Sequence, residues 1–267
     1  MLAEILEPQN QFAARFFWFR LDAIIVAIGY LLGSIPFGYL VARARGIDIR
    51  QHGSGNIGAT NVLRTLGKGP GLTVFACDAL KGLIAVLIGS HIATDPHNIR
   101  VITEAGHAYQ GANLVVTHTT YFVRLPEAVG SITAAIACII GHNFPIWLGF
   151  KGGKGMATSA GVLIGMMPSV AVSCLTLWFI VFKATRYVSL ASIAAAIMLP
   201  VSTMVFLLLG YMRGWPYFYF AVAACLLAVW RHRSNIVRLA NGTENRFEKK
   251  PKAEAAEPPA APPAAQP

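Results

Sequence analysis

Three polar stretches of this chain combine glycine with basic residues, a pattern suited to binding an anion. They are "GSGNIGATNVLR" (53–64), "GHNFPIWLGFKGGKGMAT" (141–158) and "RHRSNIVRLANGTE" (231–244). Glycine lets backbone amides approach an anion closely, and lysine or arginine supplies the counter-charge. Each stretch also has a simpler explanation: a polar turn before a helix, a basic loop at a membrane border, and an arginine anchor after a membrane helix.

The first and third stretches provide neutral donors beside their charges. In the first, the polar residues near the glycines are Ser54, Asn56, Thr60, Asn61 and Arg64. In the third, His232, Asn235 and Arg238 are three residues apart, so they share one face of a helix. Histidine and asparagine next to arginine suit a phosphate and a polyol better than they suit a lipid surface.

The middle stretch concentrates its charge in the loop "KGGKG". Lys151 and Lys154 flank two glycines whose amides carry no side-chain obstruction. The loop is not a Walker A phosphate loop, because the first glycine of that pattern is missing and Gly155 stands where serine or threonine is required. His142, nearby, is explained most simply as a helix-end histidine bonded to the backbone.

Two further polar features lie in or next to apolar segments. Asp78 and Lys81 in "CDALKG" are three residues apart and can pair, although Lys81 could instead extend to the membrane surface. Ionisable residues inside a membrane helix are costly enough to suggest a function. Ser189 and Ser192 stand at a helix start, where helix capping and substrate contact are the two alternatives.

The histidines and cysteines show no metal-binding pattern. The spacings of 6, 10 and 11 residues between four histidines match no zinc template; these are His91, His97, His107 and His118. The four cysteines lie in apolar segments without CxxC spacing, and packing explains them. The sequence therefore predicts no metal site and no cofactor.

Composition places the chain in a membrane. Of its residues 55% are hydrophobic and 13% charged, whereas a soluble domain carries about 25% charged residues. The net charge of +10 favours phosphate-bearing partners or anionic lipids over nucleic acid. Apolar segments of roughly spanning length occur at about 22–42, 70–90, 128–148, 158–183, 188–210 and 215–230.

The charges of the connections predict the topology. The three basic connections should share the cytoplasmic side, which places residues 92–127 outside. The chain leaves the cytoplasmic side after the second basic connection and is back on that side at the third, so the number of crossings between them must be even. Three apolar segments lie there, and the conflict disappears if segment 158–183 breaks at Pro168, because proline kinks or ends a helix. Residues 158–167 would then be a half-helix, too short to span the membrane. A model of six segments would put the basic C-terminal region outside. The prediction is an all-α, polytopic membrane helix bundle of about seven helical segments.

The chain divides into three parts. Residues 1–21 are predicted to be an N-terminal interfacial extension, because they contain the aromatic cluster "FFWFR". Residues 22–248 form the transmembrane domain, with an external insertion at about 92–127 whose role is not assigned. Residues 249–267 are rich in proline and alanine and are predicted to be a disordered tail.

The three polar stretches, in this order and with "DALKG" between the first two, resemble the motifs of the bacterial acyl-phosphate:glycerol-3-phosphate acyltransferases. That resemblance implies transfer of a fatty acyl group from acyl phosphate to the 1-hydroxyl of sn-glycerol 3-phosphate. The products would be lysophosphatidic acid and inorganic phosphate, in the first acylation step of phospholipid synthesis. It also implies a multi-pass enzyme of the bacterial inner membrane with a cytoplasmic active site, in contact with membrane lipids and needing no cofactor.

The resemblance also implies roles for individual residues. The catalytic residues would be Lys154, His232 and Asn235. The substrate-binding residues would be Ser54, Gly55, Asn56, Thr60, Asn61, Arg64, Lys81, Lys151, Gly152, Gly153, Ser192 and Arg238. The first motif would hold the phosphate of acyl phosphate, and the acyl chain would lie in a groove among the helices.

Two alternatives belong to other classes of protein. Acyltransferases that use acyl-CoA or acyl-carrier protein carry a histidine with aspartate five positions later, and none of the seven histidines has one. A membrane transporter of a small organophosphate could also place glycines and basic residues at broken helices. Transporters usually show a repeat and polar groups at mid-membrane, whereas the polar motifs here lie together at one face.

Overall fold

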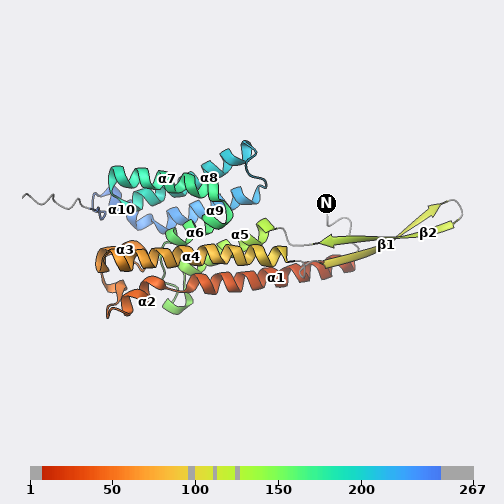
Figure 1. Cartoon of the computed structure of the whole chain (residues 1–267), viewed down its shortest axis with the longest axis horizontal. Helices are drawn as coiled ribbons and strands as arrows, with labels where there is room; N and C mark the ends of the chain where they lie inside the picture. Colours follow the sequence, from red (N-terminus) through yellow and green to blue (C-terminus); the bar gives the residue numbers. More distant parts are fainter. Residues whose placement is uncertain (1–7, 96–99, 111–112, 124–126, 248–267) are drawn as a thin grey trace, which may run out of the picture.

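The computed structural model describes residues 8–95, 100–110, 113–123 and 127–247, which form a helical bundle with a β-hairpin at one end (Figure 1). The helices are α1 (Pro8–Ser34), α2 (Phe37–Arg43), α3 (Ala59–Leu66), α4 (Lys68–Thr94), α5 (Glu127–Asn143), α6 (Met156–Met166), α7 (Pro168–Thr185), α8 (Val188–Leu208), α9 (Pro216–Arg231) and α10 (Arg233–Ala240). From Pro8 onward the expected N-terminal extension is helical and continuous with the first span. The expected tail, 249–267, lies outside the described residues.

Five helical stretches are long and apolar enough to cross a membrane. They are Asp22–Arg43, Lys68–Thr94, Glu127–Leu148, Pro168–Thr185 and Val188–Leu208. Two shorter apolar helices, Met156–Met166 and Pro216–Arg231, bring the apolar segments to the predicted seven. The chain is therefore a multi-pass membrane protein, and the helical bundle predicted from the sequence is confirmed.

The break at Pro168 is confirmed. Helix α6 ends at Met166 and α7 begins at Pro168, because proline lacks the amide hydrogen that would continue the helix. With 11 residues, α6 is about 16 Å long, roughly half the thickness of a hydrocarbon core. Met167, between the two helices, is only 2% exposed and packs into the bundle core.

Small residues let the helices approach one another closely. A methyl group on Gly89 of α4 would collide with the backbone of Gly130 of α5, and the reverse holds. Gly82 of α4 and Gly161 of α6 make equally close approaches across the α4–α6 contact. Close backbone contact of this kind is the usual basis of helix packing in membranes. It holds α6 directly against α4.

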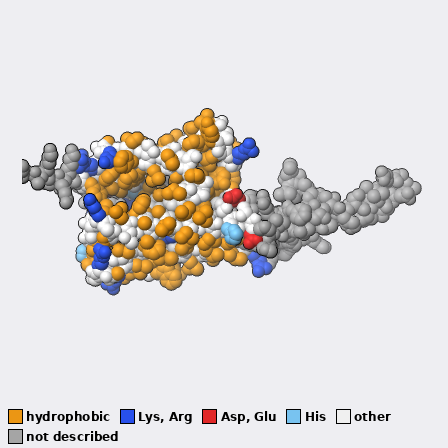
Figure 2. Space-filling view, viewed as in Figure 1, with side chains coloured by type: hydrophobic (Ala, Val, Ile, Leu, Met, Phe, Trp, Pro, Cys, Tyr) orange, Lys and Arg blue, Asp and Glu red, His pale blue; other side chains and the backbone are white. Residues whose placement is uncertain are grey.

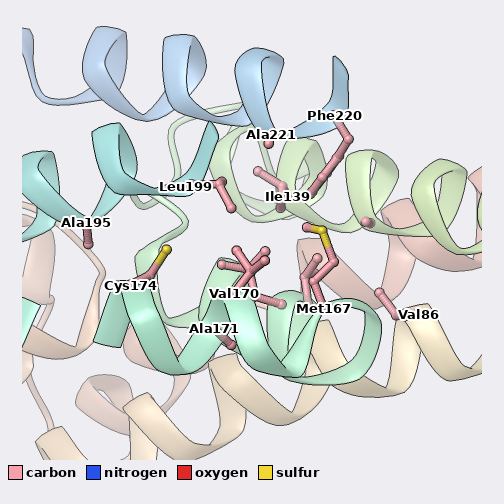
Figure 3. Packing of buried hydrophobic residues seen from close by; sticks show 13 residues of the cluster. Val86, Ile139, Met167, Val170, Ala171, Cys174, Ala195, Leu199, Phe220 and Ala221 are labelled. Carbon is pink, nitrogen blue, oxygen red and sulfur yellow. The ribbon is translucent and has the colours of Figure 1, made fainter. Parts of the chain in front are cut away.

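The largest apolar cluster lies where α5 to α9 meet (Figure 3). Met167 and Val170 from the α6–α7 break pack beside Ile139 of α5, Leu199 of α8 and Phe220 of α9. All five side chains are at most 6% exposed. The break between α6 and α7 is thus held by packing on several sides.

The insertion folds as a β-hairpin, a structure that the sequence analysis did not predict. Strands β1 (Arg100–Gln110) and β2 (Asn113–Val123) are antiparallel, with Arg100 opposite Val123. The second strand, "NLVVTHTTYFV", is rich in β-branched and aromatic residues, which favour strands. This hairpin is the exception to helical structure among the described residues, and it lies at the end of the bundle away from α3 and α10 (Figure 1).

The three polar motifs meet at the opposite end, which we call the motif end. Helices α2, α3 and α10 lie there together (Figure 1). Most of the lysines and arginines visible in Figure 2 lie at this end, while the visible acidic side chains lie beside the hairpin end. The bundle is therefore electrically asymmetric along its long axis.

Candidate active site

A cavity of about 500 Å³ opens at the motif end and extends between the helices. Its polar head is lined by residues of all three motifs, including Thr60, Lys154 and Asn235. Its apolar arm is lined by residues of α6, α7, α8 and α9, including Leu163, Cys174 and Leu199. One continuous space therefore offers a polar compartment and an apolar one, as an amphiphilic ligand requires.

Four helices begin at the polar head. Lining residues stand at or next to the starts of α3, α6, α8 and α10; among them are Ala59, Met156, Ser189 and His232. The first amide groups of a helix have no partner inside the helix, and the helix dipole is positive at that end. Four such ends around one cavity make it a site for an anion, phosphate above all.

A hydrogen-bonded network joins the second and third motifs. The ammonium of Lys154 donates to Asn235 Oδ1, and Asn235 Nδ2 donates to Glu244 Oε1 at 2.7 Å. Ser189 Oγ donates to the same oxygen at 2.8 Å, and Arg238 Nε donates to Glu244 Oε2 at 2.7 Å. Glu244 thus organises the residues around Lys154. Its position in the sequence did not predict this role, although an acidic residue four positions after the end of the basic helix α10 was a signal for it.

Burial changes the charge states in the polar head. Desolvation, with three nearby arginines, lowers the pKa of Lys154 to about 8, although Glu244 opposes the shift. Desolvation also lowers the pKa of His232 to about 4, so its imidazole is neutral at pH 7. Its Nδ1 lies 2.8 Å from the carbonyl oxygen of Ala228, which fixes the ring proton on Nδ1 and leaves Nε2 as an acceptor.

Asn61 organises the first motif. Its side chain, 3% exposed, donates to the carbonyls of His52 and Asn56, both at 2.9 Å, and accepts from the amide of Ser54 at 2.9 Å. Asn61 lies in the cavity wall, but its amide group is used by the loop itself. It therefore shapes the loop that presents Ser54, Asn56 and Thr60 to the cavity.

Arg64 connects the first motif to the end of the third. Its guanidinium donates to the carbonyl of Asn245 at 3.0 Å and lies 4.6 Å from the ring centre of Phe247. Burial lowers the pKa of Arg64, but a guanidinium keeps its charge in proteins. Arg64 therefore adds a fixed positive charge to the cavity wall.

Gly152 and Gly153 of "KGGKG", both predicted to contact substrate, do not line the cavity, whereas Gly155 at the end of this loop does. The amides of Gly152 and Gly153 donate to the carbonyls of Asn143 at 3.2 Å and His142 at 3.1 Å. Their own carbonyls accept from the guanidinium of Arg231. These glycines clamp the loop onto the end of α5, since α5 carbonyls have no partner inside their helix.

Three other predicted residues also lie off the cavity. Lys151 is exposed on the loop surface. Gly55 has a φ of +68° and serves the turn of the first motif. Lys81 is 2% exposed, with its ammonium 2.9 Å from Asp78 Oδ1 and 2.8 Å from the carbonyl oxygen of Ile35. The predicted pairing of Lys81 with Asp78 is confirmed, and Lys81 itself is not among the residues that line the cavity.

Asp78 also contacts His142. The imidazole Nδ1 lies 3.5 Å from Asp78 Oδ1, and both residues line the cavity. The simple explanation of His142 as a backbone-bonded helix end is therefore replaced by a buried contact with a carboxylate. A methyl group on Gly153 would collide with this imidazole. The Asp78–Lys81–His142 cluster thus supports the loop that carries Lys154.

The remaining predicted residues line the cavity. They are Ser54, Asn56, Thr60, Asn61, Arg64, Lys154, Ser192, His232, Asn235 and Arg238. Ser192 accepts a hydrogen bond from the indole of Trp178 at 3.3 Å. Within the described ranges, no cluster of three or more His, Cys, Asp or Glu could hold a metal ion.

Residues 23–242 match the family model "Glycerol-3-phosphate acyltransferase". A glycerol-3-phosphate acyltransferase of Thermosynechococcus vestitus is 42% identical over 225 residues, covering 84% of this chain and 94% of the relative. One of Halalkalibacterium halodurans is 40% identical over 236 residues, covering 86% of this chain and 98% of the relative.

The fold agrees with solved structures of the same kind. The crystal structure of PlsY (YgiH), an integral membrane glycerol 3-phosphate acyltransferase, in its glycerol 3-phosphate form aligns with a TM-score of 0.67 and 36% identity, covering 85% of this chain and 96% of that one. Its lysophosphatidic acid form aligns with a TM-score of 0.65 and 35% identity. Sequence, fold and the three motifs around one cavity agree, and the chain belongs to the glycerol-3-phosphate acyltransferase family.

Proposed function

We propose that this enzyme transfers a fatty acyl group from acyl phosphate to the 1-hydroxyl of sn-glycerol 3-phosphate, forming lysophosphatidic acid and inorganic phosphate. The observation that carries the proposal is the single cavity with a cationic polar head and an apolar arm. Acyl phosphate and lysophosphatidic acid are both amphiphiles with a phosphate next to a hydrocarbon chain. The glycerol 3-phosphate and lysophosphatidic acid forms of the similar PlsY structure support the choice of acceptor and product.

The residues of the polar head divide between the two substrates. Ser54 and Thr60, beside the start of α3, suit the phosphate of acyl phosphate. Lys154 and Arg64 suit the phosphate of glycerol 3-phosphate, because each supplies a positive charge in a partly desolvated space. Asn235, fixed by Glu244, is placed with His232 to orient the glycerol hydroxyls.

The reaction needs no strong base from the protein. The hydroxyl oxygen attacks the acyl carbon, the bond from that carbon to the phosphate oxygen breaks, and the hydroxyl proton must leave. His232 has a pKa of about 4, which makes it a weak base at pH 7. A phosphate oxygen, with a second pKa of about 6, is a better acceptor of that proton. The protein contributes alignment and stabilisation of the departing phosphate.

The charge distribution supports a cytoplasmic active site in the bacterial inner membrane. The motif end carries most of the visible lysines and arginines (Figure 2). Such residues are enriched on the cytoplasmic side of membrane proteins. Water-soluble glycerol 3-phosphate would then enter from the cytoplasm, and the lipid-like donor from the membrane.

The test is to incubate the purified protein in detergent with palmitoyl phosphate and glycerol 3-phosphate. We expect phosphate release that depends on glycerol 3-phosphate, and lysophosphatidic acid detected by mass spectrometry. Well-folded protein that forms neither product, but takes up glycerol 3-phosphate when reconstituted in liposomes, would instead be the transporter of the alternative hypothesis.

The pKa of Lys154 predicts how activity depends on pH. Because its pKa is about 8, the ammonium is charged below pH 8 and neutral above it. We therefore expect kcat/KM for glycerol 3-phosphate, which reports the free enzyme, to decline as pH rises through about 8. In Lys154→Arg the guanidinium stays charged, so the decline should move to higher pH. The same decline in both proteins would contradict the assignment.

Gly153 should tolerate no side chain. In Gly153→Ala the added methyl group meets the imidazole of His142 and must displace the loop that carries Lys154. A misplacement of about 1 Å in an active site can cost about 100-fold in rate, so we expect a loss of at least about tenfold in kcat. Gly69→Ala is the control, because a methyl group there meets open space. Equal kcat in the two variants would contradict this prediction, because it would show that the loop can move without a loss of catalytic rate.

A further inference from the structure

The apolar arm of the cavity follows one face of each of two long helices. On α8 the lining residues recur every three or four positions, at Ser189, Ser192, Ala195, Ala196 and Leu199. On α7 they are Ala171, Cys174, Leu175, Trp178 and Phe182. The ten steps from Ser189 to Leu199 along α8 correspond to about 15 Å at 1.5 Å per residue. The arm therefore runs parallel to α7 and α8. Its length is about half the thickness of a hydrocarbon core.

The far end of the arm is closed by protein. Figure 3 places Ala195 and Cys174 on one side of Leu199, and Ile139 and Met167 on the other. Ala195, Cys174 and Leu199 line the cavity, whereas Ile139 and Met167 are buried without lining it. The break between α6 and α7 directs Met167 into this position, so the same break that shortens α6 also fills the space beyond the arm.

One side of the cavity faces outward. Leu72 and Phe75 of α4 and Leu175 of α7 line the cavity and are nevertheless 63%, 46% and 42% exposed. A ligand chain therefore has two paths from the polar head. It can follow the arm to its closed end, or it can leave between α4 and α7 toward lipid.

We propose that the acyl chain follows the arm, and that Ala171, Cys174 and Leu199 at its closed end set the longest chain that fits. This inference rests on the proposed acyl-phosphate donor. The chains of membrane lipids cover about 15 Å each, since two leaflets make a hydrocarbon core of about 30 Å. The arm thus matches an ordinary membrane acyl chain in length. Small side chains at Ala171 and Cys174 keep its end wide enough for a methyl terminus.

The first test is the chain-length profile of Ala171→Leu. With lauroyl, palmitoyl and stearoyl phosphate as competing donors, we expect the palmitoyl-to-lauroyl ratio of kcat/KM to fall about tenfold or more, the usual effect of a methylene misfit. Leu199→Ala should shift the preference toward stearoyl phosphate. Ratios do not depend on how much of a variant is folded. Val172→Leu, a neighbour that is 64% exposed, should leave the profile unchanged. Unchanged profiles in both cavity variants would show that the chain leaves toward lipid.

The second test measures occupancy without turnover. A small methanethiosulfonate should modify Cys174 in the free protein, and mass spectrometry of the peptides gives the extent at each cysteine. Glycerol 3-phosphate is left out so that no turnover occurs. Palmitoyl phosphate should then slow the modification of Cys174 at least about fivefold. Butyryl phosphate, at a concentration that occupies the phosphate site to the same extent, should not slow it. Cys225, which does not line the cavity, is the internal reference.

The outcomes separate this inference from the proposed reaction. Protection of Cys174 without formation of lysophosphatidic acid would support the arm as the chain site and contradict the donor assignment. Turnover of palmitoyl phosphate without protection of Cys174 would support the reaction and overturn the chain path. Equal protection by the short and long donors would also overturn it, because only a long chain reaches the end of the arm.

Discussion

Lys154→Ala is expected to lower kcat/KM for glycerol 3-phosphate by about 100-fold to 1,000-fold. This is the usual cost of removing one preorganised group that stabilises charge in a transition state. The ammonium of Lys154 stands in the polar head, where partial burial strengthens its attraction for phosphate. Steady-state rates of phosphate release, measured against the concentration of glycerol 3-phosphate, give the change directly.

The chain provides a matched control three residues away. Lys151 carries the same charge on the same loop, but it is exposed and does not line the cavity. Lys151→Ala should therefore keep kcat/KM within about twofold, because an exposed charge is screened by salt and water. Equal losses in the two variants would mean that the loop acts through its general charge, and the role given to Lys154 would be wrong.

Asp78→Ala is expected to cause the largest loss of stability, about 3–5 kcal/mol in the free energy of unfolding. Asp78 and Lys81 are each 2% exposed, and their charged atoms are 2.9 Å apart. Removing the carboxylate leaves the ammonium of Lys81 buried, with the neutral carbonyl oxygen of Ile35 at 2.8 Å. Such an uncompensated charge is costly in a protein interior. Thermal unfolding in detergent, followed by circular dichroism, measures the loss.

A compensated variant tests the cause. Asp78→Asn combined with Lys81→Met removes both charges at similar volume, and neutral replacements of buried ion pairs are often tolerated. The double variant should therefore regain most of the lost thermal stability. Arg50→Ala removes the 44% exposed partner of Asp48 from an ion pair of 2.6 Å, and it should change the unfolding temperature far less than Asp78→Ala does. If the double variant were as unstable as Asp78→Ala, the uncompensated charge could not be the cause.

The features that the sequence predicted depend on rules that act along the chain. Pro168 lacks the amide hydrogen that would bond to the preceding turn, which favours a break between α6 and α7, although Pro200 lies inside the continuous helix α8. The number of crossings and the sign of the loop charges together placed three distant motifs at one end. Residues three apart on a helix share a face, which brought His232, Asn235 and Arg238 to the cavity.

What the sequence could not predict depends on how helices are rotated against each other. Glu244 accepts a hydrogen bond from Ser189, 55 residues away, and no pattern along the chain indicates that pair. Gly152 and Gly153 have the composition of an anion-binding loop, but their amides face carbonyls of α5. Glycine amides in such a loop can bind either an anion or backbone carbonyls. Here they bind the carbonyls at the end of α5, which have no donor within their own helix.

The junction at the base of the hairpin suggests where this chain can change in length. Gly89 and Gly130 bring α4 and α5 into direct contact just before the insertion leaves the bundle. Ser90 Oγ adds a hydrogen bond to Glu127 Oε1 at 2.9 Å across the same junction. These contacts hold the two helices together independently of what connects them. Evolution can therefore lengthen, shorten or replace the connection, and a protein engineer could graft a soluble fusion partner there, with the motif end of the bundle left undisturbed.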